Sequence, residues 1–348
     1  MLKLIRFISA PFVPVYLYII QTRNWLFNKG WFPVRKCAAA VISIGNITVG
    51  GSGKTPAVIY ITGLLKERGK KPGILSRGYR RKSKGYLFVS DGKEIKCSVD
   101  ECGDEMYYVS TETGVPTSVC ERRVKGARNF LKDAQLDTIV LDDAFQHRWI
   151  HRDLNIVIID QRFLLKFNSM EQKMLPLGMM REPFSSLERA DMIIINRKFS
   201  DKKPVPVKLL PYFEGKKVFN GFYNAEGFFD VKTHQYFPVN DFVGQKSLIV
   251  CGIARPYSFF GVLEQNNIDF TNKMIFTDHK DYTEREIQAI RKQFYDSNAH
   301  SVLTTQKDAV KFSKFSKELD DIDIYFLKIG LKIEEEESFK ENLFKIYK

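Results

Sequence analysis

A short glycine-rich segment constrains the fold of this chain more than any other part of the sequence. It reads TVGGSGKT at residues 48–55, follows the apolar run AAAVISIGN and precedes the helical pattern AVIYITGLLKERG. A bound phosphate needs backbone N–H groups that approach it closely, and glycines permit that approach at a helix N-terminus, where the helix dipole also favours an anion. The strand–loop–helix order therefore predicts a phosphate-binding loop in an α/β domain.

The residues of this loop have separate expected roles. We expect the Lys54 ammonium to reach the β- and γ-phosphates of a nucleotide and the Thr55 hydroxyl to ligate Mg²⁺. Thr48 stands six residues before the lysine, where such loops usually carry their first glycine. The strand before the loop and the helix after it still favour nucleotide binding. The predicted nucleotide-binding residues are Thr48, Gly50, Gly51, Ser52, Gly53, Lys54 and Thr55.

Apolar runs alternate with amphipathic helical patterns along most of the chain. TIVLDDAF, LNIVIID and ADMIIINR are typical of buried parallel strands. The fold class that we predict is α/β, with a doubly wound, mostly parallel P-loop sheet domain and a smaller α/β C-terminal domain. We expect the P-loop domain to span residues 29–215 and the C-terminal domain residues 239–348. Between them, the alternation around NAEG (residues 224–227) predicts a β-hairpin linker over residues 216–238.

The positive charge of the chain is concentrated in its N-terminal part. Residues 1–99 carry 18 Lys/Arg and 3 Asp/Glu, whereas the remainder carries 36 and 38, and the net charge is +13. Such an excess attracts an anionic partner, and nucleic acid, acidic lipid headgroups and a phosphorylated substrate are all candidates.

The first segment helps to choose among these partners. Residues 7–22 (FISAPFVPVYLYIIQT) are uncharged and flanked by basic residues, but a spanning helix needs about 20 apolar residues. Trp25, Phe27 and Trp31 follow where a secretory signal would have a small-residue cleavage site. We predict that residues 1–28 form a helix in the membrane interface. A buried helix of the core and a true span are the alternatives.

Acidic residues end one of the predicted buried strands. In TIVLDDAFQH, Asp142 and Asp143 have the form of a metal-binding strand end, where an acid holds Mg²⁺. Because successive strand residues point to opposite faces, the two acids are expected to serve different purposes, one for the metal and one for a neighbouring hydrogen bond. Which of them ligates Mg²⁺ directly stays open. His147 is expected to face the same cleft.

Phosphorylation of an alcohol also requires a group that takes or orients the proton. Asp104 and Glu105 lie at an expected helix start, where acids are also common as helix caps. His279 lies in the polar loop TDHKD, where a histidine is commonly just exposed.

An ordered set of motifs extends over nearly the whole chain. GNITVGGSGKTP, SRGYRRK, CGDEMYY, LDDAFQHR, LPLGMMREP, NRK, CGIARP, TDHKDYT and TTQKDAVK occur in this order. Together they resemble the tetraacyldisaccharide 4′-kinase family. The resemblance implies transfer of the γ-phosphate of ATP, with Mg²⁺, to the 4′-hydroxyl of a tetraacyl glucosamine disaccharide 1-phosphate. It also implies a place in lipid A biosynthesis, on the cytoplasmic face of the bacterial inner membrane.

The resemblance also assigns roles to individual residues. It implies that Asp104 is the general base and that His279 of the C-terminal domain supports it, so that domain closure completes the site. Further positions match active-site or substrate-contact residues of the family, namely Arg77, Tyr79, Arg181 and Glu182. From their places beside the acidic residues, we expect Glu105 and His147 to support the site.

Other functions fit the sequence less well. A GTPase or partitioning-type ATPase is the first alternative, but TTQKD places its lysine and aspartate side by side, unlike a guanine-binding motif. The run RGYRRKSKG lacks interleaved stacking aromatics beyond Tyr79 and the following Tyr86, and it has no recognisable nucleic-acid-reading module, so we expect no nucleic-acid partner. Five irregularly spaced cysteines argue against a disulfide framework or a zinc site. The expected partners are the lipid A disaccharide precursor and anionic membrane lipids, with no obligate protein partner evident.

Overall fold

The computed structural model describes residues 10–253, 256–277 and 280–348. The chain divides into two compact units: Met1–Phe222 with Lys332–Lys348, and Tyr223–Leu331.

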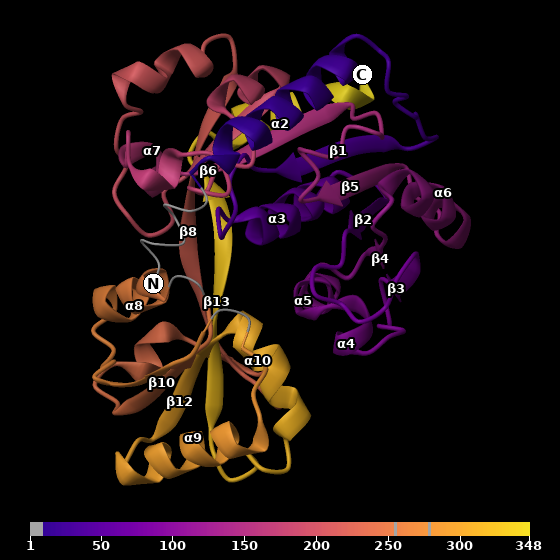
Figure 1. Cartoon of the computed structure of the whole chain (residues 1–348). Helices are drawn as coiled ribbons and strands as arrows, with labels where there is room; N and C mark the ends of the chain where they lie inside the picture. The colour runs from indigo at the N-terminus through magenta and orange to yellow at the C-terminus, as the bar shows by residue number, and fades with distance from the viewer. Residues whose placement is uncertain (1–9, 254–255, 278–279) are drawn as a thin grey trace. The chain divides into compact units, whose positions relative to one another are not determined.

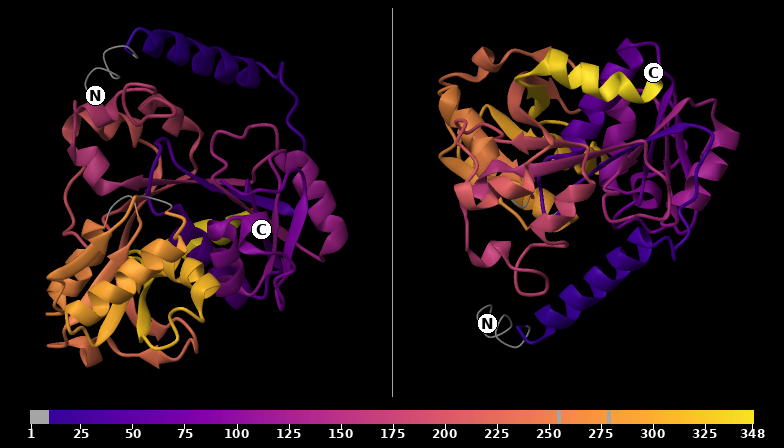
Figure 2. Two further views of the ribbon diagram at one scale, coloured as in Figure 1. Left: turned by 60° about the horizontal axis from the view of Figure 1, so that its bottom comes forward. Right: turned by 90° about the horizontal axis from the view of Figure 1, so that it is seen from above.

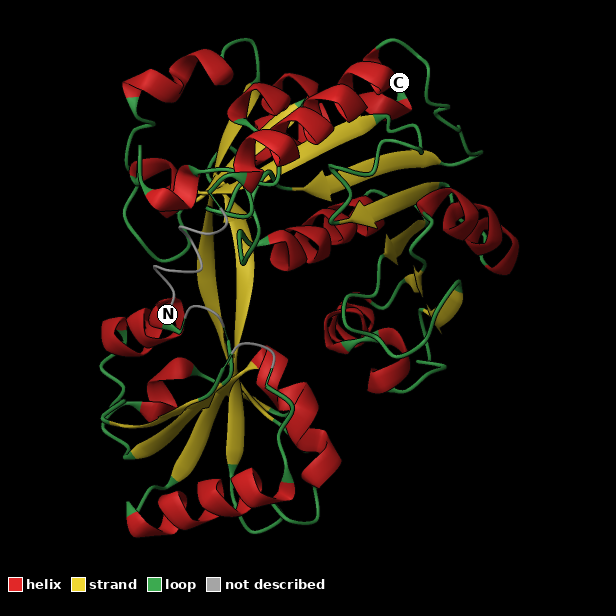
Figure 3. Cartoon of the chain, in the orientation of Figure 1, coloured by secondary structure: helices red, strands yellow, loops and turns green. Residues whose placement is uncertain are grey.

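The first unit is built on a mostly parallel sheet (Figures 1 and 3). Its strands follow the order β7-β6-β1-β5-β2-β4-β3, and only the edge strand β3 runs antiparallel to its neighbour. The first residues of β8 (Lys217–Asp230) extend the sheet beside β7. The strands are β1 Ala40–Gly45, β2 Pro72–Ser76, β3 Leu87–Asp91, β4 Pro116–Val119, β5 Thr138–Asp142, β6 Leu154–Asp160 and β7 Met192–Asn196.

Both faces of this sheet are buried. Along β6, Val157 and Ile159 belong to one apolar cluster, while Ile156 and Ile158 point to the opposite face and are equally buried. This burial explains why the central strands read as continuous apolar runs instead of alternating ones. The helices of the unit are α2 Phe12–Asn28, α3 Lys54–Glu67, α4 Val99–Cys102, α5 Asp104–Thr113, α6 Arg123–Asp133, α7 Gln161–Leu165 and α11 Glu336–Leu343, with 3₁₀ turns η1 Met170–Gln172, η2 Phe184–Arg189, η3 Val207–Tyr212 and η6 Phe344–Tyr347.

The parallel pairing brings the carboxyl ends of several strands to one edge. Ile44 in β1 pairs with Asp142 in β5, and Leu75 in β2 pairs with Leu141. The loops that follow β1, β2 and β5 therefore begin side by side. In open α/β sheets, ligands bind at this edge.

The N-terminal helix α2 lies at the surface of the first unit in both views of Figure 2. Val13, Tyr16 and Leu17 pack against the apolar cluster of the unit, whereas Tyr18 and Ile19 are 70% and 57% exposed. The helix is thus neither a fully buried core helix nor a free one. No helix among residues 10–253, 256–277 and 280–348 is long and apolar enough to cross a membrane. Residues 1–9 of the predicted interface helix lie outside the described residues.

Four strands of the second unit pair in parallel, in the order β11-β10-β12-β13. Its core includes Leu248 and Val250 from β10 and Ile287 and Ile290 from α9, which are spaced for one helix face. The elements are β10 Ser247–Cys251, α8 Tyr257–Gln265, β11 Asn272–Ile275, α9 Glu284–Asp296, β12 Ser301–Thr305, α10 Gln306–Phe312, η5 Ser313–Phe315 and β13 Ile324–Ile333, with η4 Val239–Phe242 before them.

The expected hairpin differs from the observed one in the place of its turn. Strand β8 continues through residues 224–227 and pairs antiparallel with β9 (Tyr236–Phe237), so the turn lies at residues 231–235. The Asp230 carboxylate accepts hydrogen bonds from the backbone N–H groups of Lys232 and Thr233, at 2.9 and 2.6 Å, which fixes the turn there. Asparagine and glycine inside NAEG are therefore not turn residues in this chain.

Candidate active site

The glycine-rich loop joins the end of β1 to the start of α3, as the sequence predicts. Gly50 and Gly53 have φ of 98° and 101°, in the left-handed region that favours glycine. A Cβ at Gly50 would lie 3.2 Å from Met179 Cε, so the loop also has little space for a side chain there. Gly53 is the N-cap residue of α3, and Lys54 begins the helix. The loop therefore presents a helix N-terminus with glycines before it.

Buried amides hold this loop in place. Asn46 Nδ2 donates to Ser52 Oγ (2.9 Å), and Asn196 Nδ2, at the end of β7, donates to the Ser52 backbone carbonyl (3.1 Å). The Lys198 ammonium bonds the Gly51 carbonyl at 3.0 Å. Sequence reasoning missed Asn46, Asn196 and Lys198 as site residues. The available signal was a polar residue directly after a buried apolar run, as in IIINRK.

Asp143 lies beside two cations of the site. Its Oδ1 is 3.7 Å from Lys54 Nζ, and Arg181 donates to both carboxylate oxygens, at 2.7 and 3.2 Å. Although burial raises the pKa of the Asp143 carboxyl, Lys54 and Arg181 outweigh this effect and lower it to about 2. Asp143 is therefore ionised at neutral pH.

Asp142 has a different environment although it is the adjacent residue. It is the last residue of β5, it is buried, and its Oδ2 accepts a hydrogen bond from Ser76 Oγ at 2.9 Å. Burial raises the pKa of the Asp142 carboxyl to about 6, and repulsion from Glu105 and Asp143 adds to the effect. The two acids thus hold their protons over different pH ranges, which fits different roles.

The segment before α5 approaches the loop that follows β2. Asp104 is the first residue of α5, and its Oδ1 accepts the Glu105 backbone N–H at 2.9 Å. A Cβ at Gly103, whose φ is 89°, would lie 3.0 Å from the Tyr79 carbonyl oxygen, so glycine permits this approach. In this loop, the Tyr79 side chain is exposed. The positive charge of Arg77 lowers the pKa of His147. The Glu105 carboxylate, on α5, raises the pKa of the Asp142 carboxyl, at the end of β5.

His147 lies in the turn that follows β5. Its backbone N–H donates to the Ala144 carbonyl at 2.9 Å, and its Nε2 is buried without a hydrogen-bond partner in the described structure. Desolvation, together with the nearby charges of Arg123, Arg152 and Arg77, lowers the pKa of the His147 imidazole to about 4. The ring is therefore neutral at physiological pH.

Arg123 is a further residue that sequence reasoning missed. It is buried, and its guanidinium donates to the Cys120 carbonyl at 3.0 Å and to the Asp142 carbonyl at 3.3 Å. It thereby adds a positive charge beside the two aspartates. Only its place at the start of a helix that follows a strand (VCERRV) could have indicated it.

Of the two predicted site residues in the REP motif, Arg181 contacts Asp143 and Glu182 does not. Glu182 is fully buried and forms ion pairs with Arg23 of α2 and with Arg189. The structure thus brings Lys54, Asp143 and Arg181 together, whereas Glu182 is paired with other residues in the interior. His279, in the second unit, lies outside the described residues.

The residues present fit a nucleotide and Mg²⁺. Left-handed glycines and a helix N-terminus suit phosphate oxygens, and Lys54 adds a positive charge. Mg²⁺ is commonly held by one or two carboxylates together with substrate phosphates. Asp142 and Asp143 offer such carboxylates at the end of β5, and Asp143 lies 3.7 Å from Lys54, the residue before Thr55.

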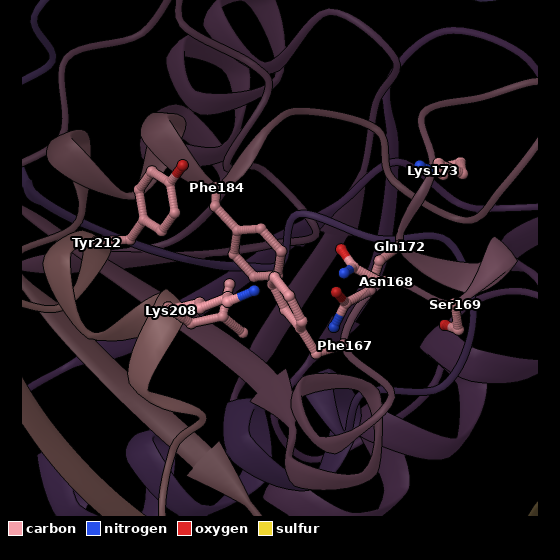
Figure 4. Close-up of a pocket in the computed structure, with 9 residues that line it drawn as sticks. Phe167, Asn168, Ser169, Gln172, Lys173, Phe184, Lys208 and Tyr212 are labelled. Carbon is pink, nitrogen blue, oxygen red and sulfur yellow. The ribbon is translucent and has the colours of Figure 1, made fainter.

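A pocket of about 210 Å³ lies elsewhere on the first unit (Figure 4). Phe167, Phe184 and Tyr212 line it together with the Lys208 side chain. None of the predicted site residues contributes to it. Phe167 and Phe184 pack against the same apolar cluster as the inner face of α2.

The fold and the loop define a P-loop phosphate-binding α/β protein with acids at the end of a neighbouring parallel strand. A family model described as LpxK, tetraacyldisaccharide-1-P 4′-kinase, matches residues 5–348. The chain therefore belongs to this family, and the family resemblance seen in the sequence is confirmed.

Individual relatives agree over nearly the whole length. The tetraacyldisaccharide 4′-kinase of Aquifex aeolicus is 33% identical over 338 residues, which are 97% of this chain and 98% of the relative. The enzyme of the same name from Halothermothrix orenii is 35% identical and covers 95% of this chain and 90% of the relative. The crystal structure of "apo" form LpxK from Aquifex aeolicus in complex with ATP matches with a TM-score of 0.80 at 32% identity, over 99% and 100% of the two chains. The predicted P-loop α/β fold class is confirmed.

Proposed function

We propose that this chain transfers the γ-phosphate of ATP to the 4′-hydroxyl of a tetraacyl glucosamine disaccharide 1-phosphate, a step of lipid A biosynthesis. The observation that carries the proposal is the group of Lys54, Asp143 and Arg181 beside the glycine-rich loop, in a member of the tetraacyldisaccharide-1-P 4′-kinase family. Relatives that bear this name match over almost their whole length.

The glycine-rich loop binds the phosphates of ATP in this proposal. Its N–H groups and Lys54 hold the β- and γ-phosphates and stabilise the charge that develops during transfer. Thr55, Asp142 and Asp143 would hold Mg²⁺, which would supply positive charge for the transfer when it is bound. Arg181 keeps Asp143 ionised and oriented.

Asp104 takes the proton of the acceptor hydroxyl, and His279 supports it. A carboxylate within hydrogen-bond reach of the acceptor hydroxyl can take its proton in the transition state. Arg77 and Tyr79 contact the sugar, since an arginine suits a sugar phosphate through paired donors. Glu105 and the neutral His147 support the acidic cluster.

The enzyme acts at the surface of a membrane. Extraction of a lipid with four acyl chains into water costs about 0.8 kcal/mol per CH₂ group, or roughly tens of kcal/mol in all, so the acceptor stays in the bilayer. The exposed apolar face of α2 and the basic first 99 residues suit an anionic lipid surface. We place the chain on the cytoplasmic face of the inner membrane.

Transfer of label from γ-labelled ATP to purified tetraacyldisaccharide 1-phosphate in detergent micelles with Mg²⁺ tests this function. We expect a labelled glycolipid with the wild-type chain and a loss of about 10³-fold or more with Lys54→Met, because the lysine charge acts on the transferred phosphoryl group. Binding of ATP without any labelled glycolipid would contradict the proposal. Equal use of GTP would favour a switch protein.

A further inference from the structure

The inner face of α2 is bonded to the segment that carries Arg181 and Glu182. Tyr16 Oη donates to the Arg181 carbonyl at 3.0 Å, and the Arg23 guanidinium forms an ion pair with the Glu182 carboxylate. Val13 and Leu17 pack beside these contacts on the cluster that contains Met180. Tyr16 and Arg23 are about two helical turns apart. Their two polar contacts therefore hold α2 against two consecutive residues of this segment.

The Glu182 carboxylate is a rigid anchor. Its side chain is 0% exposed, and the guanidinium groups of Arg23 and Arg189 hold its two oxygens. A buried carboxylate is tolerated only when it is paired, so Glu182 cannot move away from Arg23 without losing half of its compensation. Any displacement of α2 at Arg23 is therefore resisted at Glu182.

The same segment is bonded to the phosphate-binding loop. The N–H groups of Arg181 and Glu182 donate to the Ile47 carbonyl at 2.8 and 3.3 Å, and the Val49 N–H donates to the Met179 carbonyl at 2.8 Å. From its side chain, Arg181 holds Asp143 through both terminal nitrogens. The position of this segment therefore determines the positions of the phosphate-binding loop and of the Asp143 carboxylate.

The outer face of α2 is apolar and exposed. Phe12, Val15, Tyr18 and Ile19 are each more than half exposed. Val13 and Leu17 face the apolar cluster, and Tyr16 and Arg23 lie at the border between the packed and the exposed side. The occupant of the outer face is the lipid surface, because the acceptor resides there and the N-terminal part of the chain is strongly basic. A helix held by lipid on one side and by Glu182 on the other is fixed more firmly than by either alone.

We propose that Tyr16 and Arg23 are positioning residues for phosphoryl transfer, which couple the docking of α2 on lipid to the placement of Arg181, Asp143 and the phosphate-binding loop. The inference rests on the proposed function, because it assumes a lipid-anchored acceptor. A lipid surface can favour one arrangement of the site only if it binds that arrangement more tightly than the others. The contact of α2 with lipid provides this difference in affinity. Small misplacements of charged groups at a transfer site cost large factors in rate.

Variants of Arg23 test the inference in the full chain on anionic vesicles that contain the acceptor. We expect Arg23→Gln to lower kcat by about 10-fold or more and to change KM for ATP and vesicle binding by less than about 2-fold. Arg23→Lys keeps the charge beside Glu182 and should recover part of kcat. Tyr16→Phe removes one hydrogen bond and should lower kcat less.

Arg148→Gln is the matched control. Arg148 donates to the Asn24 carbonyl (3.1 Å) and to Asn28 Oδ1 (2.7 Å) on the same helix, and none of its hydrogen bonds in the described structure goes to residues 181–182. We expect Arg148→Gln to lower the melting temperature as much as Arg23→Gln does. Its kcat should nevertheless stay within about 2-fold of the wild type. A similar kcat in Arg23→Gln and Arg148→Gln would overturn the inference.

A second readout compares the vesicle acceptor with a short-chain, water-soluble acceptor. The wild type should have the higher kcat on vesicles, and Arg23→Gln should lose this increase while it still binds vesicles. An unchanged increase in Arg23→Gln would contradict the coupling. A wild-type chain that phosphorylates neither acceptor would instead contradict the proposed function.

Discussion

Two adjacent aspartates of this chain differ because of what surrounds each side chain. Asp143 lies against Lys54 and Arg181, which keep it ionised, whereas Asp142 is buried next to a serine hydroxyl and other carboxylates. Their pKa values of about 2 and about 6 follow from these neighbours. At the residue scale, the charge of each acid is therefore determined by side chains from other elements of the fold.

Replacement of Asp142 should stabilise the metal-free chain. Because folding raises the pKa of Asp142 from 3.8 to about 6, its contribution to stability is fully present below pH 4 and is lost as pH rises through 6. Asp142→Asn mimics the protonated acid, so the free energy of unfolding at pH 8 should rise by up to about 3 kcal/mol, with little change at pH 4. Urea unfolding at both pH values, without Mg²⁺, measures this.

Asp143→Asn is the control for that measurement. Folding lowers the pKa of Asp143, so its ionised form contributes stability above pH 4, and this contribution is lost as pH falls toward 2. Asp143→Asn should therefore destabilise the chain at pH 8. The same sign of change in both variants would show that the electrostatic account of the pair is wrong.

The roles of Asp104 and His279 lead to a kinetic prediction. If the pair takes the proton of the acceptor, Asp104→Ala and His279→Ala should each lower kcat by roughly 10²–10⁴-fold. KM for ATP should change far less, because the nucleotide is held by the glycine-rich loop. Steady-state kinetics with varied ATP measures both constants, and near-normal turnover in either variant would refute its role.

At the scale of elements, α2 has a side that is bonded to the site segment and a side that is apolar and exposed. Its inner face holds residues 181–182, and its outer face exposes large apolar side chains. Burial of one such side chain is worth about 1.5–3 kcal/mol. In the proposed function, side chains of this exposed face supply part of the affinity for lipid.

Removal of that apolar surface should weaken membrane binding. We expect the double variant Tyr18→Ser/Ile19→Ser to bind anionic vesicles at least about 10-fold less tightly, because two exposed side chains no longer enter the lipid. Sedimentation with vesicles measures the change. Val243→Ser, at an exposed apolar position of the second unit, serves as the comparison and should bind like the wild type. Equal binding of all three chains would rule out α2 as the docking element.

The predictability of the elements followed their burial. Strands β5, β6 and β7 were predicted because both of their faces are buried and, apart from Thr138 and Asn155, their residues are apolar until the polar end. Strand β3 was missed because it is a short antiparallel edge with a partly exposed sequence, LFVSD. The turn of the hairpin was predicted too early, because Asp230, which fixes it, lies outside the most turn-like sequence.

The site was predictable only where one short segment carries it. The glycines, Lys54 and the aspartate pair are recognisable from local order alone. Asn196, Lys198 and Arg123 act through contacts with residues farther away in the sequence, and such contacts depend on the strand order, whereas Asn46 bonds to Ser52 of the same loop. Family resemblance indicated Arg181 and Glu182, but not that Glu182 bonds to Arg23 of α2.

At the scale of the whole molecule, charge and apolar surface occur in the same part of the chain. The excess of positive charge lies within residues 1–99, which also contain α2 and the phosphate-binding loop. A membrane-anchored acceptor and a soluble nucleotide can then be brought to one unit. The central claim is that this unit joins them at one hydroxyl group.

Phosphorus–proton correlation NMR of the glycolipid product tests that claim most directly. The wild-type chain, incubated with ATP, Mg²⁺ and tetraacyldisaccharide 1-phosphate, should yield a second phosphomonoester signal that is coupled to the proton on C4′ of the distal glucosamine. A product with no second phosphorus, or with one coupled to a different sugar proton, would contradict the account.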